Sequence, residues 1–275
     1  MDWSKAKNIL IVAFIITNIF LLYNVYKNMN ENNFFYINDE TVEDVKKILE
    51  ERNIFIETEV PKKVPSLPIL KVKYETYDGD ELAKKILGDY QKVDDKYFDA
   101  DRNERIEVSH NNKFFTYERK LMTSNINKIS LEEVKKFADK FIEDYGFNDE
   151  SVKYSDTISK DNGEYEVIYK QSYNGMFLED LGDVKDEEMA TRLEMRVTVN
   201  NTGIIKFTRK WIVPDGTKSH AKRVIPSTKA LLMAIEDINN GNDEKAIITD
   251  ISLGYILDVP NFDTLINDEW YEMES

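Results

Sequence analysis

The stretch RLEMRVTVNNTGIIKFTRKWIV, residues 192–213, indicates the fold class more directly than the rest of the sequence. Two runs rich in β-branched and aromatic residues, Arg192–Val199 and Ile204–Val213, flank the turn-forming triplet Asn201-Thr202-Gly203. Such a pattern predicts an antiparallel β-hairpin. Further hairpins are predicted by the same reasoning at 105–119 and 164–181.

Helices are fewer, and the clearest one begins at Ser130. Ser130 and Glu133 have the spacing of a capping box, and Gly146 provides a helix end. Between them, apolar side chains recur at helical spacing: Leu131, Val134, Ala138, Phe141, Ile142 and Tyr145. Shorter helices are predicted at 38–52, 80–87 and 226–239, and strands at 54–60, 69–74 and 246–257.

The run Ile9–Tyr26, ILIVAFIITNIFLLYNVY, contains no charged residue. An α-helix over this run measures about 27 Å, close to the ~30 Å hydrocarbon core of a bilayer. Trp3 lies at one end, with Tyr23 and Tyr26 at the other, as expected for rings at the headgroup level. The sequence therefore predicts a single transmembrane helix that crosses the lipid bilayer through residues 9–26.

A cleaved signal peptide is the alternative, and two features disfavour it. The apolar run is longer than a usual signal core, and the segment Asn24–Met29 has bulky residues where a cleavage site needs small ones. Lys5 and Lys7 favour a cytoplasmic N-terminus. We therefore expect a single-pass protein of the cell membrane, with the bulk of the chain extracytoplasmic.

Many hairpins and few helices predict an α+β fold. We expect an N-terminal single transmembrane helix followed by an exterior domain of antiparallel sheets with helices packed on one side. The order of a helix followed by hairpin strands recurs, which suggests two lobes. The predicted organisation is an anchor with its cytoplasmic tip at 1–28, a first lobe at 29–125 and a second at 126–275.

The chain has a formal net charge of −15 over 275 residues and no cysteine. Binding to nucleic acid needs clustered Lys and Arg to neutralise phosphates, so this acidic chain is not expected to bind it. The same charge disfavours close adhesion to anionic lipid. With 41% hydrophobic residues, the exterior part is long enough to form a real core.

No motif predicts a catalytic, cofactor or metal site, so we expect a protein that is not an enzyme. Asp99-x-Asp101-x-Asn103 resembles the start of a calcium loop, but the sixth position is Glu104 and the twelfth is His110. An acidic surface loop is the simpler interpretation. The other histidine, His220, has no partner at zinc-site spacing, and no glycine-rich phosphate loop is present.

The opening Met1–Ser4, followed by Lys5 and Lys7, an Ile/Phe-rich run and the segment Asn18–Leu22, resembles the start of the YycI family. A second resemblance is Leu253-Gly254-Tyr255 near the C-terminal end. The resemblance implies a single-pass membrane protein that, with the related YycH, controls the YycG (WalK) sensor histidine kinase of a system governing cell-wall metabolism. It also implies an α+β exterior domain and contact with partners through transmembrane helices.

Within the predicted anchor, Ala13 and Thr17 are small residues one turn apart, and Asn18 places an amide in hydrocarbon. Together they are the candidate helix-contact residues, since inter-helix hydrogen bonds of this kind contribute about 0.6–2 kcal/mol. The alternative is that Thr17 bonds its own helix backbone and that Asn18 tolerates the membrane without a partner helix.

Two other functions stay open. One is an anchored exterior binding module for a peptide or cell-wall component, without a kinase partner. The other is an anchored hydrolase, which would need a cleft with carboxylates or an activated nucleophile.

Overall fold

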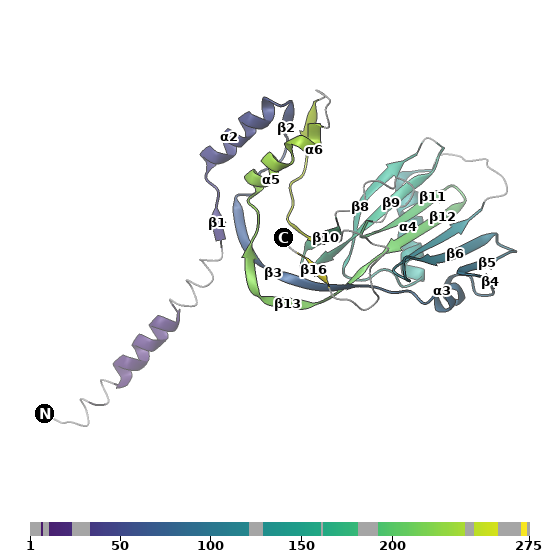
Figure 1. Ribbon diagram of the computed structural model, residues 1–275, viewed down its shortest axis with the longest axis horizontal. Helices are drawn as coiled ribbons and strands as arrows, with labels where there is room; N and C mark the ends of the chain where they lie inside the picture. Colours follow the sequence, from purple (N-terminus) through teal and green to yellow (C-terminus); the bar gives the residue numbers. More distant parts are fainter. Residues whose placement is uncertain are drawn as a thin grey trace. The chain divides into compact units, whose positions relative to one another are not determined.

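The computed structural model describes residues 7, 11–23, 34–120, 129–160, 162–180, 192–239, 245–257 and 271–273 (Figure 1). These residues form an α+β structure, which confirms the predicted mixture of antiparallel sheets and helices. The chain divides into two compact units. Unit 1 comprises Met1–Leu67 and Ala221–Ser252, and unit 2 comprises Pro68–His220 and Leu253–Ser275.

This division differs from the predicted one near residue 125, which falls inside unit 2. The reason lies in the strand pairing: β7 (Phe114–Arg119) pairs antiparallel with β12 (Gly203–Lys210), so strands on both sides of residue 125 share one sheet. Local periodicity identifies strands but carries no information about their distant partners.

In unit 1, short strands accompany helices α2, α5 and α6 and the N-terminal helix at 11–23. Its elements are β1 (Phe34–Tyr36), α2 (Asp39–Glu50), β2 (Ile54–Ile56), α5 (Ser227–Met233), α6 (Ile235–Asn239) and β14 (Ala246–Ile248). Helix α2 begins where the Asn38 side chain accepts a 2.8 Å hydrogen bond from the Thr41 amide. Strand β2 pairs in parallel with β14. β1 pairs antiparallel with the part of β3 (Lys63–Tyr74) that belongs to this unit.

Unit 2 contains a sheet of ten described strands in the order β15-β10-β9-β11-β12-β7-β6-β5-β4, with β8 paired to β9. Neighbours run antiparallel except β10 and β15, which are parallel. The remaining strands of this sheet are β4 (Gln91–Val93), β5 (Lys96–Asp99), β6 (Glu104–Ser109), β8 (Val152–Ser159), β9 (Tyr165–Tyr173), β10 (Met176–Asp180), β11 (Glu194–Asn200) and β15 (Gly254–Leu257). Outside it, β16 (Tyr271–Met273) pairs with β3.

The three predicted hairpins are present as β6–β7, β9–β10 and β11–β12. Their turns use residues that tolerate positive φ. Asn111 and Asn112 have φ of 54° and 64°, and Asn174 and Gly175 have φ of 50° and 80°. Turn chemistry is local, which is why the sequence predicts these hairpins correctly.

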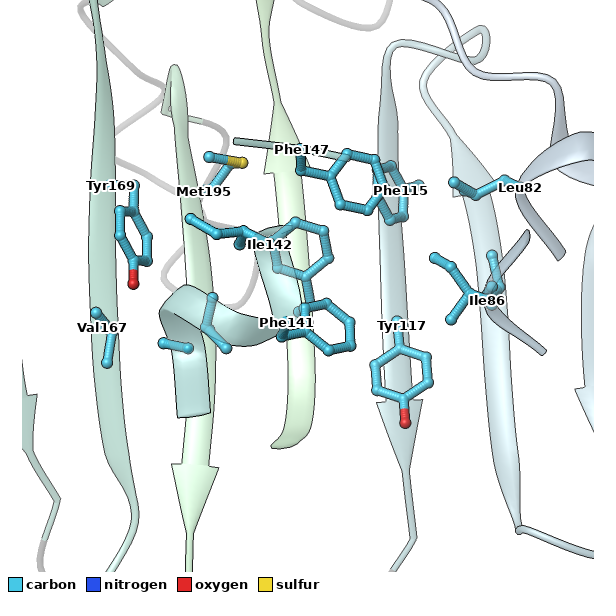
Figure 2. Close-up of a cluster of buried hydrophobic side chains, with 14 of the residues drawn as sticks. Leu82, Ile86, Phe115, Tyr117, Phe141, Ile142, Phe147, Val167, Tyr169 and Met195 are labelled. Atoms are coloured by element: carbon cyan, nitrogen blue, oxygen red, sulfur yellow. The ribbon is translucent and has the colours of Figure 1, made fainter. Parts of the chain in front are cut away.

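Helices α3 (Gly79–Ile86) and α4 (Leu131–Asp144) pack against one side of the unit 2 sheet and enclose its core (Figure 2). Helix α4 is capped by the predicted box between Ser130 and Glu133 and buries Val134, Ala138, Phe141 and Ile142. The sheet contributes alternate residues to the same core, including Ile106, Phe115, Tyr117, Val167, Tyr169, Met195 and Phe207. These contacts confirm the prediction of helices on one side of an antiparallel sheet.

Three predicted elements are divided in the structure. The strand predicted at 246–257 becomes β14 in unit 1 and β15 in unit 2, because its two ends pair with different strands. The strand predicted at 204–213 ends at Lys210, and β13 (Ile212–Arg223) begins two residues later. The helix predicted at 226–239 is divided at Ala234 into α5 and α6.

Candidate functional site

The described part of the N-terminal run forms a helix at 11–23 whose apolar side chains are exposed. Thr17 Oγ1 donates a 2.9 Å hydrogen bond to the Ala13 carbonyl, and Asn18 Nδ2 donates a 3.0 Å hydrogen bond to the Phe14 carbonyl. Ala13 and Thr17 thus lie together on one face, with Asn18 next to them. Both polar side chains therefore donate a hydrogen bond to the backbone of their own helix. For Thr17, this is the alternative given in the sequence analysis.

Within the described residues, no helix combines the length and hydropathy that a membrane crossing requires. The predicted span at 9–26 lies partly outside them, since the structure describes 11–23 of that run. The contact of Ala13, Thr17 and Asn18 with another helix therefore stays a prediction.

A second candidate site is an open cleft of about 990 Å³ in unit 2, where helix α4 ends against the sheet. Its lining combines buried aromatic and cationic side chains with exposed carboxylates, and includes Glu75, Lys85, Phe147, Asp149, Arg209 and Trp211. The volume is in the upper part of the range for small-molecule sites in proteins.

Arg209 forms the base of this cleft. It lies on β12 at an inward-facing position, opposite Phe115 and Met195 on the neighbouring strands, and only 4% of it is exposed. Its Nη1 donates to Glu75 Oε2 at 2.5 Å and to the Tyr77 hydroxyl at 2.7 Å. A buried guanidinium is tolerated here because it is paired and hydrogen-bonded.

Aromatic rings surround the same guanidinium. Its carbon lies 4.9 Å from the Trp211 ring centroid, 5.4 Å from that of Phe147 and 5.7 Å from that of Tyr77. Burial raises the pKa of Tyr77, so its hydroxyl stays protonated at neutral pH. This cage fixes the orientation of Arg209 and leaves little freedom for the arginine to move.

Trp211 interrupts the strand between β12 and β13. Its carbonyl accepts a 2.9 Å hydrogen bond from the Glu75 amide, whereas its buried Nε1 has no hydrogen-bond partner among the described residues. The next residue, Ile212, is held by the side chain of Gln171. That amide donates to the Ile212 carbonyl at 2.8 Å and accepts from the Ile212 amide at 3.2 Å.

Positively and negatively charged side chains both line the cleft. The ammonium of Lys85 lies 5.0 Å from the Phe147 ring centroid. Asp149 and Glu150 are exposed in the turn that follows α4, and Asp149 Oδ1 accepts a 2.7 Å hydrogen bond from the Ser151 amide. The cleft therefore presents cations and carboxylates to the same space.

Sequence reasoning did not identify this cleft. One signal was available: in the predicted strand at 204–213, Arg209 falls on the same face as Phe207 and Trp211, where a charged residue is unusual. The contributions of Lys85 and Phe147 come from distant parts of the chain and leave no local pattern.

The motifs that the sequence analysis set aside have structural roles. Asp99 accepts hydrogen bonds from the Asp101 and Arg102 amides and from Arg102 Nε, the last at 2.5 Å. The Arg102 side chain lowers the pKa of Asp99. His110 lies in the β6–β7 turn with Ser109 Oγ 2.8 Å from its Nδ1, and the side chain of His220 lies outside the described part. Among the described residues, no group of three or more His, Asp or Glu is arranged to hold a metal ion.

Comparison with solved structures finds two similar folds. YycH from Bacillus subtilis shares 12% sequence identity at a TM-score of 0.47, over 74% of this chain and 52% of that chain. An uncharacterized protein from Eubacterium rectale shares 11% identity at a TM-score of 0.47, over 88% and 82%. This chain thus spans about half the length of the YycH structure that it matches.

Comparison with curated proteins finds no match. The model of the YycI protein family, in contrast, matches residues 32–266. That range covers residues of both units. It begins after the N-terminal segment Met1–Leu22 and includes the second resemblance, Leu253-Gly254-Tyr255. The chain therefore belongs to the YycI family.

Proposed function

We propose that this protein is a membrane-anchored extracytoplasmic regulator, without catalytic activity, of a YycG-type sensor histidine kinase. It would act together with a YycH-like protein in a two-component system that controls cell-wall metabolism. The observation that carries the proposal is the family match over residues 32–266. Anchoring by the N-terminal helix is the mechanism by which such a regulator would reach the kinase.

The exposed apolar surface of the helix at 11–23 supports the anchor. Its large side chains are 45–69% exposed, an arrangement that is costly in water and favourable in hydrocarbon. The hydrogen bonds from Thr17 and Asn18 to carbonyls one turn earlier reduce the cost of placing a hydroxyl and an amide in lipid. The helix is therefore suited to a bilayer without a partner, and a partner helix can add contacts to it.

Regulation requires only that the protein contact two states of the kinase with different affinity. Asn18 is the residue expected to contribute most, because its amide can exchange the bond to Phe14 for one to a neighbouring helix. Ala13 and Thr17 provide a face on which a second helix backbone can approach closely. The sign of the regulation follows from which state gains the contact.

The test is a detergent pull-down with tagged full-length protein, beside a copy in which residues 1–28 are replaced by an unrelated anchor. We expect a histidine kinase and a YycH-like protein to co-purify with the native form and to be lost with the foreign anchor. Asn18→Leu should reduce recovery while leaving membrane insertion intact, whereas Ile15→Leu, the matched control, should not. Equal recovery with both anchors would place the contact in the exterior part, and recovery with neither would refute the kinase partnership.

An exterior binding module for a peptide or cell-wall component is the second candidate function. The cleft around Arg209 favours it, because it offers a concave site with convergent polar groups. This candidate differs from the first in having no kinase partner, so the pull-down described above separates the two.

A further inference from the structure

We propose that the cleft of unit 2 binds short zwitterionic peptides, with the ligand carboxylate at Arg209, Trp211 and Lys85 and its ammonium group at Asp149 and Glu150. The inference concerns the exterior part alone. It holds whether or not the helix at 11–23 contacts a kinase.

The unpartnered indole of Trp211 is the first observation. Only 2% of this residue is exposed, and its Nε1 lacks a hydrogen-bond partner among the described residues. Buried donors are nearly always satisfied, and Trp211 is one of the residues that line the cleft. Its unpaired donor therefore favours an acceptor supplied from outside the protein. A carboxylate oxygen is the strongest acceptor that a peptide can offer.

Arg209 provides the charge for that carboxylate. The hydrogen bonds found to Glu75, Tyr77 and Met195 engage its Nη1 and Nε, and none found in the described part engages Nη2. The guanidinium has five donors in a fixed fork, so a carboxylate can bind the outer side while Glu75 holds the inner side. The aromatic cage keeps this fork in place before the ligand arrives.

Lys85 adds a second cation on the same side. Its ammonium lies over the Phe147 ring at 5.0 Å, and the Arg209 guanidinium lies 5.4 Å from that ring. Because Glu75 already compensates Arg209, the positive charge of Lys85 is what makes this part of the cleft attractive to an anion.

The carboxylates of Asp149 and Glu150 give the cleft its second pole. Both side chains are exposed on a turn that lines the same space, and a ligand ammonium can displace water from them at little cost. A purely anionic ligand would be repelled by this pole. At about 990 Å³ the cleft is larger than a single amino acid needs, which favours a ligand of a few residues.

The experiment uses full-length protein in detergent micelles. The chain has three tryptophans, and the substitutions Trp3→Phe and Trp270→Phe leave only Trp211. The probes are trialanine, trialanine amide and N-acetyl-trialanine, and the readout is Trp211 emission. We expect a saturable change with trialanine. Binding should be at least tenfold weaker for the amide, which lacks the carboxylate, and for the acetylated form, which lacks the ammonium.

Variants of adjacent lysines separate the cleft from general charge effects. Lys85→Met should weaken binding of trialanine at least fivefold, whereas Lys84→Met, on the same helix but outside the cleft lining, should leave it unchanged. Circular dichroism confirms that each variant is folded. The proposal is overturned if no probe gives a saturable change, if the amide binds as well as trialanine, or if the two lysine variants behave alike.

Discussion

The Lys210 ammonium on β12 lies 2.5 Å from the Asp180 carboxylate at the end of β10, and both side chains are almost completely buried, at 3% and 6% exposure. The other oxygen of Asp180 accepts a 3.1 Å hydrogen bond from the Leu193 amide. Since β10 and β12 are not adjacent in the sheet, this ion pair joins strands that backbone pairing leaves separate.

Removing one partner of this pair should strongly destabilise unit 2. We expect Asp180→Asn or Lys210→Met to lower the free energy of unfolding by about 3–5 kcal/mol, because each leaves a buried group without its partner. Replacing both together should cost clearly less than the sum of the single changes. Urea unfolding followed by tryptophan emission measures the free energy of unfolding of each variant. Lys140→Met, which breaks the exposed pair with Asp144, should cost less than about 1 kcal/mol.

The burial of Lys210 also predicts a pH dependence. Burial lowers the pKa of Lys210 from its usual 10.5, and Asp180 only partly opposes this. Between that lowered pKa and 10.5 the unfolded chain binds more protons than the folded one, so stability rises with pH in this window. Relative to the Asp180→Asn, Lys210→Met double variant, the native protein should therefore gain stability as the pH rises through this window towards 10.5. A constant difference between the two would show that Lys210 has an ordinary pKa.

The centre of the unit 2 core should be sensitive to truncation. Phe207 is fully buried and contacts the rings of Phe115, Phe141 and Phe147 at centroid distances of 5.2–5.4 Å. We expect Phe207→Ala to cost about 3–5 kcal/mol of unfolding free energy. Phe137→Ala on helix α4 is the matched control, because Phe137 is 41% exposed and its loss should cost much less. Equal effects in denaturant unfolding would contradict this packing.

The hydrogen bond between helix α4 and the sheet makes a smaller contribution. The Tyr169 hydroxyl donates to Asp139 Oδ1 at 2.7 Å, and burial followed by this bond raises the pKa of Tyr169. Tyr169→Phe should cost about 0.5–1.5 kcal/mol at neutral pH. Because the folded state holds the phenolic proton more tightly, the native protein should lose this stabilisation above about pH 10, and the difference from the variant should shrink there. A loss above about 3 kcal/mol at neutral pH would mean that the side chain does more than make this bond.

The sequence predicted those parts of the fold that local chemistry determines. The capping box at Ser130 and the turns at Asn112 and Asn174 depend on residues close together in the chain, and the corresponding helix and hairpins are present. Sheet order depends instead on pairings such as Phe115 with Arg209, which no periodicity reveals. The same limit explains why the unit boundaries and the division of 246–257 were not predicted.

The candidate sites differ in the same way. Ala13, Thr17 and Asn18 are visible in the sequence because polar and small residues are conspicuous in an apolar run. The cleft is not, because Lys85, Phe147 and Arg209 come from three separate parts of the chain: helix α3, the segment after helix α4, and strand β12. The one sequence signal for the cleft is the position of Arg209 on the same strand face as Phe207 and Trp211.

The pairing of β7 with β12 also has a consequence for how the chain is made. Arg119 of β7 bonds to Thr202, at the turn before β12, across 83 residues of sequence. At typical synthesis rates of 5–20 residues per second, roughly 4–17 s pass before the ribosome supplies that partner. During this time β7 presents an open edge with Phe114 and Phe115 exposed, a hazard for aggregation. Unit 2 therefore completes its fold only after most of the chain has been synthesised, and a holding chaperone should raise its yield.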